Sequence, residues 1–159
     1  MSVIASVQPA LPPRQYPQEQ ITEMFLQVLD DPSREQLVRR LHRSTRVNTR
    51  HLVLELDEYR MLTDFGAAND AFIEHAVALA SSALLGALDQ AGLRPRDVDV
   101  VFSTTVTGIA APAIEARVAA IVGLRPDVKR VPMFGLGCVA GAAGIARLHD
   151  HLCGSPDSV

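Results

Sequence analysis

Cys138 is the residue whose type and setting most directly suggest chemistry. It follows Gly135 and Gly137, where an apolar strand-like segment changes into a helix-like one. Backbone N–H groups and the helix dipole stabilise a thiolate at a helix N-terminus, and the same N–H groups can bind a developing oxyanion. The glycines permit a tight turn and a close approach of substrate to the backbone. Cys138 is therefore a candidate nucleophile, and a small buried apolar cysteine is the open alternative.

A cysteine nucleophile usually works with a histidine base, but no histidine here has a sequence relation to the cysteine that nominates it. His149 and His151 follow it on the same predicted helix, roughly 16–20 Å along the axis, and are expected to be solvated. His75 is expected to be a packed or rim residue, and His42 and His51 flank an arginine cluster. No CxxC or HxxxH pattern occurs, so no metal site is predicted.

Apolar spacing and turn residues predict the elements that position the cysteine. They indicate strands over 3–7, 98–105 and 129–133, and helices over 18–29, 32–43, 69–91, 113–122 and from 138 to about 152. Asp31 is a predicted N-cap, and Gly92 and Gly123 are predicted helix ends. Strand–helix–strand–helix order with apolar strands favours an α/β layered fold with a largely parallel sheet. In the last helix, Gly141 and Gly144 predict close packing of another element, because glycine disfavours helices.

Composition limits the function classes. The 159 residues are 48% apolar and 21% charged, which predicts a folded chain. A net charge of −3 gives no basic field for nucleic acid or an anionic membrane. The longest apolar stretch, 76–88, is too short to cross a bilayer, and the N-terminus does not resemble a signal peptide. Two cysteines without a disulfide framework favour a cytoplasmic location.

The segment 123–141, GLRPDVKRVPMFGLGCVAG, resembles the nucleophile region of type III polyketide synthases, the chalcone/stilbene synthase family. Segments 45–54 and 104–112 and the first predicted strand with its proline-rich loop agree, so the resemblance covers essentially all 159 residues and is strongest to bacterial members. It implies the thiolase fold, a homodimer of five-layered αβαβα subunits. Residues 1–159 would then form the N-terminal thiolase-like domain, truncated before the C-terminal half.

The resemblance also implies a reaction. An acyl group is loaded from coenzyme A onto Cys138, extended by decarboxylative condensation with malonyl-CoA-type units, and cyclised. Coenzyme A thioesters are the substrates, and no separate cofactor is implied. Thr107 aligns with a hydroxyl residue that lines the pocket. Ala111 aligns where some relatives carry a bulky residue, and we expect it to leave room for larger acyl starters.

Arg40 aligns with a family basic residue near the coenzyme A phosphates. Two other basic positions of that site are Leu37 and Ser44 here, and Arg43 could substitute for them. Arginine pairs bidentately with phosphate, so the cluster is a reasonable anion site, or else a solvated helix end.

The family's base histidine and its partner asparagine belong to the C-terminal half, so residues 1–159 alone are expected to make no polyketide. Two alternatives remain at this stage. One is a ketoacyl synthase III or thiolase-like condensing enzyme, and the other is a non-catalytic fragment that only dimerises.

Overall fold

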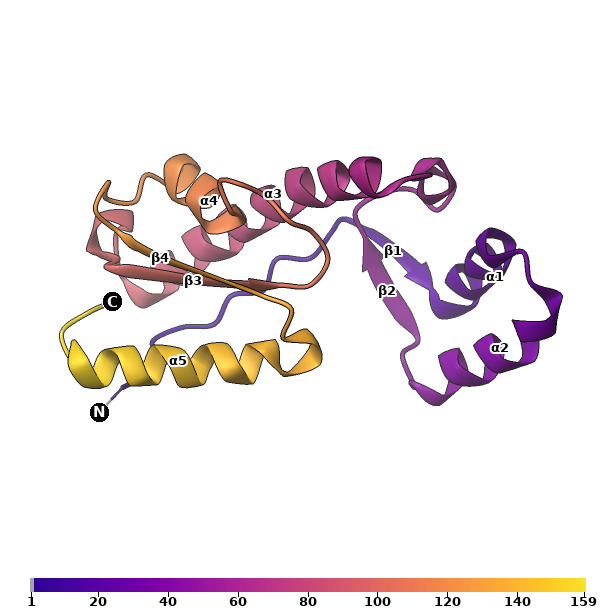
Figure 1. Cartoon of the computed structure of the whole chain (residues 1–159). Coiled ribbons are helices and arrows are strands. Elements are labelled where there is room, and N and C mark those ends of the chain that lie inside the picture. Colours follow the sequence, from indigo (N-terminus) through magenta and orange to yellow (C-terminus); the bar gives the residue numbers. More distant parts are fainter. Residues whose placement is uncertain (1) are drawn as a thin grey trace. The chain divides into compact units, whose positions relative to one another are not determined.

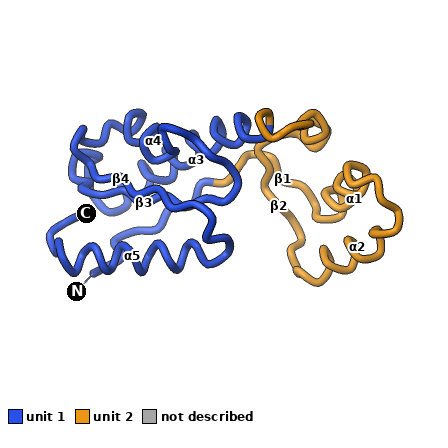
Figure 2. Tube along the Cα trace, in the orientation of Figure 1, with its two compact units in different colours: residues 1–10, 68–159 blue, residues 11–67 orange. Residues whose placement is uncertain are grey.

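The computed structural model describes residues 2–159, which form two compact units (Figure 2). One unit comprises residues 11–67, and the other comprises residues 68–159 together with the N-terminal residues up to Ala10.

The unit of residues 11–67 pairs a short β-ribbon with two helices. β1 (Arg14–Pro17) runs antiparallel to β2 (Thr49–Leu52), and α1 (Gln18–Leu29) follows β1 directly. The predicted helix 32–43 begins as a 3-10 turn (Pro32–Arg34) and continues as α2 (Glu35–Ser44). Asp31 caps it as predicted, since its Oδ1 accepts the Ser33 N–H at 3.0 Å. A further 3-10 turn spans Glu58–Met61.

The strand predicted over residues 3–7 is wrong. These residues form no strand, because no other strand of the described chain lies alongside to accept their backbone hydrogen bonds. Val3, Ile4 and Val7 are instead largely exposed. The segment is anchored where the Ser6 hydroxyl donates to the carbonyl of Ala87, 2.7 Å away.

The second unit has the predicted strand–helix–strand–helix order. It contains most of α3 (Phe65–Ala91), a 3-10 turn (Pro95–Asp97), β3 (Val100–Thr105), α4 (Ile114–Val122), β4 (Lys129–Phe134), a 3-10 turn (Gly137–Val139) and α5 (Ala140–Gly154). β3 and β4 are parallel, with Thr105 opposite Phe134 at the carboxyl end. Figure 1 shows α5 on one side of this pair and α3 and α4 on the other, so the unit has three layers.

The core of this unit lies between α3, α4 and the start of the strand pair. Its buried residues come from the two helices and from the turns that precede β3 and β4: Leu88, Val98, Val118, Ala119, Val122, Leu124 and Val128. Val118 and Val122 are one helical turn apart and so share a face of α4. Gly123 ends that helix in the left-handed conformation at φ +79°, as the sequence predicted.

The helix α3 is longer than the apolar stretch 76–88 suggested. Its 27 residues are long and apolar enough to cross a membrane by length and composition. A core helix of a soluble protein meets the same criterion, and α3 contributes Leu88 to the core. The sequence expectation that the stretch is too short is thus corrected for the helix as a whole.

Candidate functional site

Cys138 lies in a strand-to-helix turn at the carboxyl end of the β3–β4 pair. β4 ends at Phe134, and the next residue, Gly135, donates its N–H to the carbonyl of Thr105 on β3, at 3.2 Å. Gly135 and Gly137 adopt φ values of +88° and +60°, a region that glycine enters without the steric cost of a Cβ. The two glycines thereby allow the chain to reverse from the strand toward α5.

The thiol of Cys138 is exposed, so it is not the small buried cysteine that the sequence left open. The residue lies in the 3-10 turn Gly137–Val139, immediately before α5, rather than in the first turn of the helix itself. No side chain caps α5 at Val139. The Ala140 N–H, the first of the helix, donates to the Gly137 carbonyl within the 3-10 turn.

No histidine of residues 2–159 forms a hydrogen bond with Cys138. His149 instead contacts the second cysteine, with Nε2 3.7 Å from Cys153 Sγ. His151 was expected to be solvated, but it is half-buried, with its ring centroid 6.5 Å from that of Phe102. Across these residues, no group of three or more His, Cys, Asp or Glu side chains could hold a metal ion.

Thr107 and Ala111 lie in the loop that follows β3. This loop and the Cys138 turn both leave the carboxyl edge of the same strand pair, since Thr105 and Phe134 are register partners. The Thr107 N–H donates to Thr105 Oγ1 at 3.1 Å, and the side chains of Thr107 and Ala111 are exposed. The Cys138 turn and the loop that carries Thr107 and Ala111 thus begin at the same edge of the strand pair.

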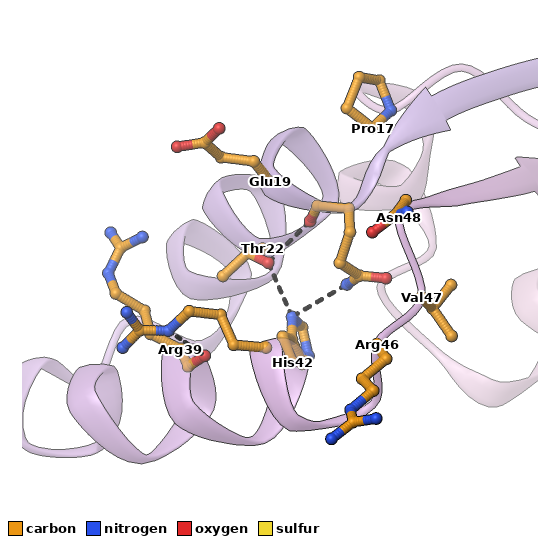
Figure 3. Close-up of a pocket in the computed structure, with 10 residues that line it drawn as sticks. Pro17, Glu19, Thr22, Arg39, His42, Arg46, Val47 and Asn48 are labelled. Carbon is orange, nitrogen blue, oxygen red and sulfur yellow. Dashed lines mark hydrogen bonds between the residues drawn. The ribbon is translucent and has the colours of Figure 1, made fainter.

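The other two predicted residues, Arg40 and Arg43, belong to the unit of residues 11–67. That unit contains a cavity of about 530 Å³ at the start of α1 and the end of α2 (Figure 3). The lining combines three arginines and a histidine with one carboxylate, and it consists of Pro17, Gln18, Glu19, Thr22, Arg39, His42, Arg43, Arg46, Val47 and Asn48. Arg43 is part of it, but Arg40 is exposed and is not.

The helical period explains this division. Arg39, His42 and Arg43 follow an i, i+3, i+4 spacing, which places side chains on one face of a helix. Arg46 lies beyond the end of α2, in the left-handed conformation at φ +55°, and reaches the cavity from the chain that follows the helix. Arg40 is about 100° around the axis from Arg39. The spacing was visible in the sequence and would have identified His42, whereas Arg46, beyond the helix, carried no such signal.

The cavity holds the imidazole of His42 in place. Thr22, which is 5% exposed, donates its hydroxyl hydrogen to the carbonyl of Gln18 at 2.7 Å. Its oxygen lies 2.9 Å from His42 Nδ1, and the Gln18 side-chain nitrogen lies 3.2 Å from the same atom (Figure 3). The Gln18 side-chain nitrogen can only donate, so Nδ1 either accepts from it or, when it carries a hydrogen, donates to Thr22, and it does not do both at once.

The arginines of the cavity differ in how far their charge is paired. Arg39 binds Glu23 with two hydrogen bonds and Glu35 with a third at 2.8 Å. These bonds raise the pKa of Arg39 and lower that of Glu23. Arg43 donates only through Nε, to the carbonyl of Arg39 at 3.3 Å. Among the residues that the structure describes, no carboxylate pairs with Arg43 or Arg46, which leaves both free for an anion.

Comparison with known proteins finds a family model and relatives that match most of the chain. The model of the chalcone and stilbene synthase N-terminal domain matches residues 1–153. The 1,3,6,8-tetrahydroxynaphthalene synthase of Streptomyces peucetius is 52% identical over 155 residues, covering 97% of this chain and 41% of that protein. The phloroglucinol synthase of Pseudomonas fluorescens is 35% identical over 147 residues, covering 88% of this chain and 42% of that protein.

A solved structure agrees with these sequence relatives. The 1,3,6,8-tetrahydroxynaphthalene synthase of Streptomyces coelicolor, a bacterial type III polyketide synthase, superposes with a TM-score of 0.85 at 27% identity. The match covers 96% of this chain and 44% of that one. The fold is therefore the N-terminal portion of the thiolase fold, and the chain spans about two fifths of the length of these relatives. The chain belongs to the chalcone and stilbene synthase family, the type III polyketide synthases.

Proposed function

We propose that this chain carries the nucleophile of an acyltransferase of polyketide biosynthesis, with Cys138 accepting an acyl group from an acyl-CoA. The observation that carries the proposal is the exposed thiol in a glycine turn at the carboxyl edge of β3 and β4, in a chain of this family. The whole protein would extend the bound acyl group by decarboxylative condensation with malonyl-CoA-type units.

The loading step is a thioester exchange. The Cys138 thiolate attacks the acyl carbonyl, the new C–S bond forms, and the bond to the coenzyme A sulfur breaks to release coenzyme A as thiolate. Backbone N–H groups of the turn that carries Cys138 would stabilise the oxyanion of the tetrahedral intermediate. The exposed thiol permits this attack, and no histidine of residues 2–159 is hydrogen-bonded to it. We therefore expect slow loading here and place the base histidine and asparagine of the condensation step outside these residues.

We propose that arginines of the unit 11–67 bind the coenzyme A phosphates. Arg43, together with Arg46, supports this assignment because no carboxylate of residues 2–159 neutralises either guanidinium. Arg40 keeps its role as the position aligned with the family's basic residue. Coenzyme A thioesters are thus substrates, and the reaction needs no further cofactor.

The names of the relatives support a polyketide product, since they are synthases of tetrahydroxynaphthalene and phloroglucinol. A roomy pocket at Ala111 would suit larger acyl starters. We propose a homodimer located in the cytoplasm. Large exposed apolar side chains such as Ile121, 65% exposed, are consistent with further burial in an assembly.

Mass spectrometry tests the loading step. Incubating the chain with an acyl-CoA should add one acyl mass to the peptide that contains Cys138 and none to that peptide in Cys138→Ser. Cys153→Ser is the matched control, because Cys153 is also exposed and has a histidine nitrogen 3.7 Å away. An adduct that persists in Cys138→Ser and disappears in Cys153→Ser would refute the assignment. The absence of any adduct would favour the non-catalytic fragment that only dimerises.

A further inference from the structure

The loop between β3 and α4 is held at three points. Near its start, the Thr107 N–H donates to Thr105 Oγ1 at 3.1 Å. Near its end, Arg117 Nε donates to the carbonyl of Pro112 at 3.0 Å. Both of these bonds come from residues close in sequence to the loop. The middle of the loop is held by a residue that lies 40 positions earlier, Asn69 of α3.

Asn69 binds both backbone groups of Ile109. Its Oδ1 accepts the Ile109 N–H at 2.8 Å, and its Nδ2 donates to the Ile109 carbonyl at 2.9 Å. A backbone residue offers one N–H donor and one C=O acceptor, and the Asn69 amide is hydrogen-bonded to both of these groups of Ile109. The two bonds fix the orientation of this peptide as well as its distance from α3.

The neighbouring Gly108 allows this approach. It is buried, and a Cβ built on it would lie 2.2 Å from Phe72 Cδ1 and 2.8 Å from Asn69 Oδ1. Real side chains cannot approach so closely. The glycine therefore lets the loop backbone lie directly against α3, where Asn69 reaches it.

The side chains of the loop are left free by these contacts. Val106 and Ile109 are 51% and 59% exposed, and Thr107 and Ala111 are also exposed. The backbone is thus fixed while the side chains remain available to line a cavity. The Cys138 turn starts at the same edge, where Gly135 is bonded to Thr105.

We propose that Asn69 is a positioning residue. It holds residues 106–111 so that Thr107 and Ala111 stand as one wall beside Cys138, and it thereby helps to set which groups reach the thiol. Its consequence for acyl-CoA selection rests on the proposed function, but its effect on the loop and on access to Cys138 does not. α3 serves as a rigid support for a loop whose own residues are few and partly exposed.

Hydrogen exchange tests whether the two hydrogen bonds between Asn69 and Ile109 hold the loop. Asn69→Leu keeps an approximately similar size and removes both bonds, whereas Asn69→Asp keeps the acceptor for the Ile109 N–H and loses the donor. Asp70→Asn is the matched control, because Asp70 is exposed and makes no side-chain hydrogen bond in the described chain. We expect exchange at residues 106–111 about tenfold faster in Asn69→Leu, with Asn69→Asp between it and wild type. Exchange equal to that of Asp70→Asn would overturn the proposal.

Thiol reactivity tests the positioning. Cys138 and Cys153 are both exposed, so peptide mapping can follow each with a short and a long-chain N-alkylmaleimide. We expect the long-to-short rate ratio at Cys138 to change by about threefold or more in Asn69→Leu, with the ratio at Cys153 unchanged. Equal ratios in wild type and variant, or a change shared by both cysteines, would show a structural role only and refute positioning. Alkylation needs no acyl transfer, so this outcome is separate from the fate of the proposed function. Acylation by a short and a long acyl-CoA then reports on substrate selection.

Discussion

Replacing Ser103 with alanine tests how α4 is fastened to β3. Glu115, in the first turn of α4, is 4% exposed, and its Oε2 accepts the Ser103 hydroxyl at 2.6 Å. No other side chain of residues 2–159 is hydrogen-bonded to this carboxylate. Ser103→Ala therefore leaves a buried acid without its partner, in the helix that follows the loop of Thr107 and Ala111.

The cost follows from the burial. Removing one partner of a buried hydrogen bond leaves the other desolvated and unpaired, which costs about 1–3 kcal/mol. A loss of about 2 kcal/mol in a chain of this size lowers the melting temperature by about 4–8 °C. Ser82→Ala should change the free energy of unfolding by less than about 0.5 kcal/mol, because Ser82 is exposed on α3.

Thermal and urea unfolding of the three proteins measures this difference, and a double-mutant cycle with Glu115→Ala isolates the pair. We expect a coupling energy of about 1 kcal/mol or more between the two positions. If Ser103→Ala matches Ser82→Ala, or if the cycle shows no coupling, the hydrogen bond does not fasten the helix and the reasoning fails.

Three other substitutions probe acid stability, close packing and helix propensity. Arg39 lowers the pKa of Glu23, so the contribution of this pair is present above the ordinary value of 4.5 and is lost as pH falls through the lower folded value. Urea unfolding at pH 7 and pH 3 should therefore show a smaller acid loss in Glu23→Gln, and equal losses would contradict it. Gly108→Ala should cost about 1–3 kcal/mol by thermal unfolding, because its Cβ would overlap Phe72. Gly141→Ala should stabilise by up to about 0.5 kcal/mol, since its Cβ meets nothing within 4 Å; a loss would reveal a contact that the described residues do not provide.

Structural features that depend on a few neighbouring residues could be predicted from the sequence. The Asp31 cap, the left-handed ends at Gly92 and Gly123 and the glycine turn at Cys138 depend on local backbone geometry, and all four are present. The expectation from Gly141 and Gly144 holds only in part. A Cβ at Gly144 would meet Met133 at 3.4 Å, whereas one at Gly141 would meet no atom of the described chain.

Contacts between distant residues were not readable in the same way. A strand needs a partner, so the apolar pattern of residues 3–7 could not decide whether they pair. For the same reason β1, within the proline-rich loop, went unpredicted, because its partner β2 lies more than 30 residues away. The hydrogen bonds between Asn69 and Ile109 likewise join residues 40 positions apart. A single asparagine within a helical pattern does not indicate such a contact.

The separation of the predicted site residues into two units gives a way to dissect the reaction. If Arg43 binds coenzyme A phosphates, Arg43→Ala should slow acylation of Cys138 by acyl-CoA. It should leave alkylation of Cys138 by a maleimide unchanged, because that reagent has no phosphate and the thiol lies in the other unit. Arg60→Ala is the matched control, since Arg60 is exposed in the same unit as Arg43 and outside the cavity. Equal acylation rates in these two variants would remove Arg43 from the site, and Arg40→Ala, measured alongside, would show whether the aligned arginine alone binds the phosphates.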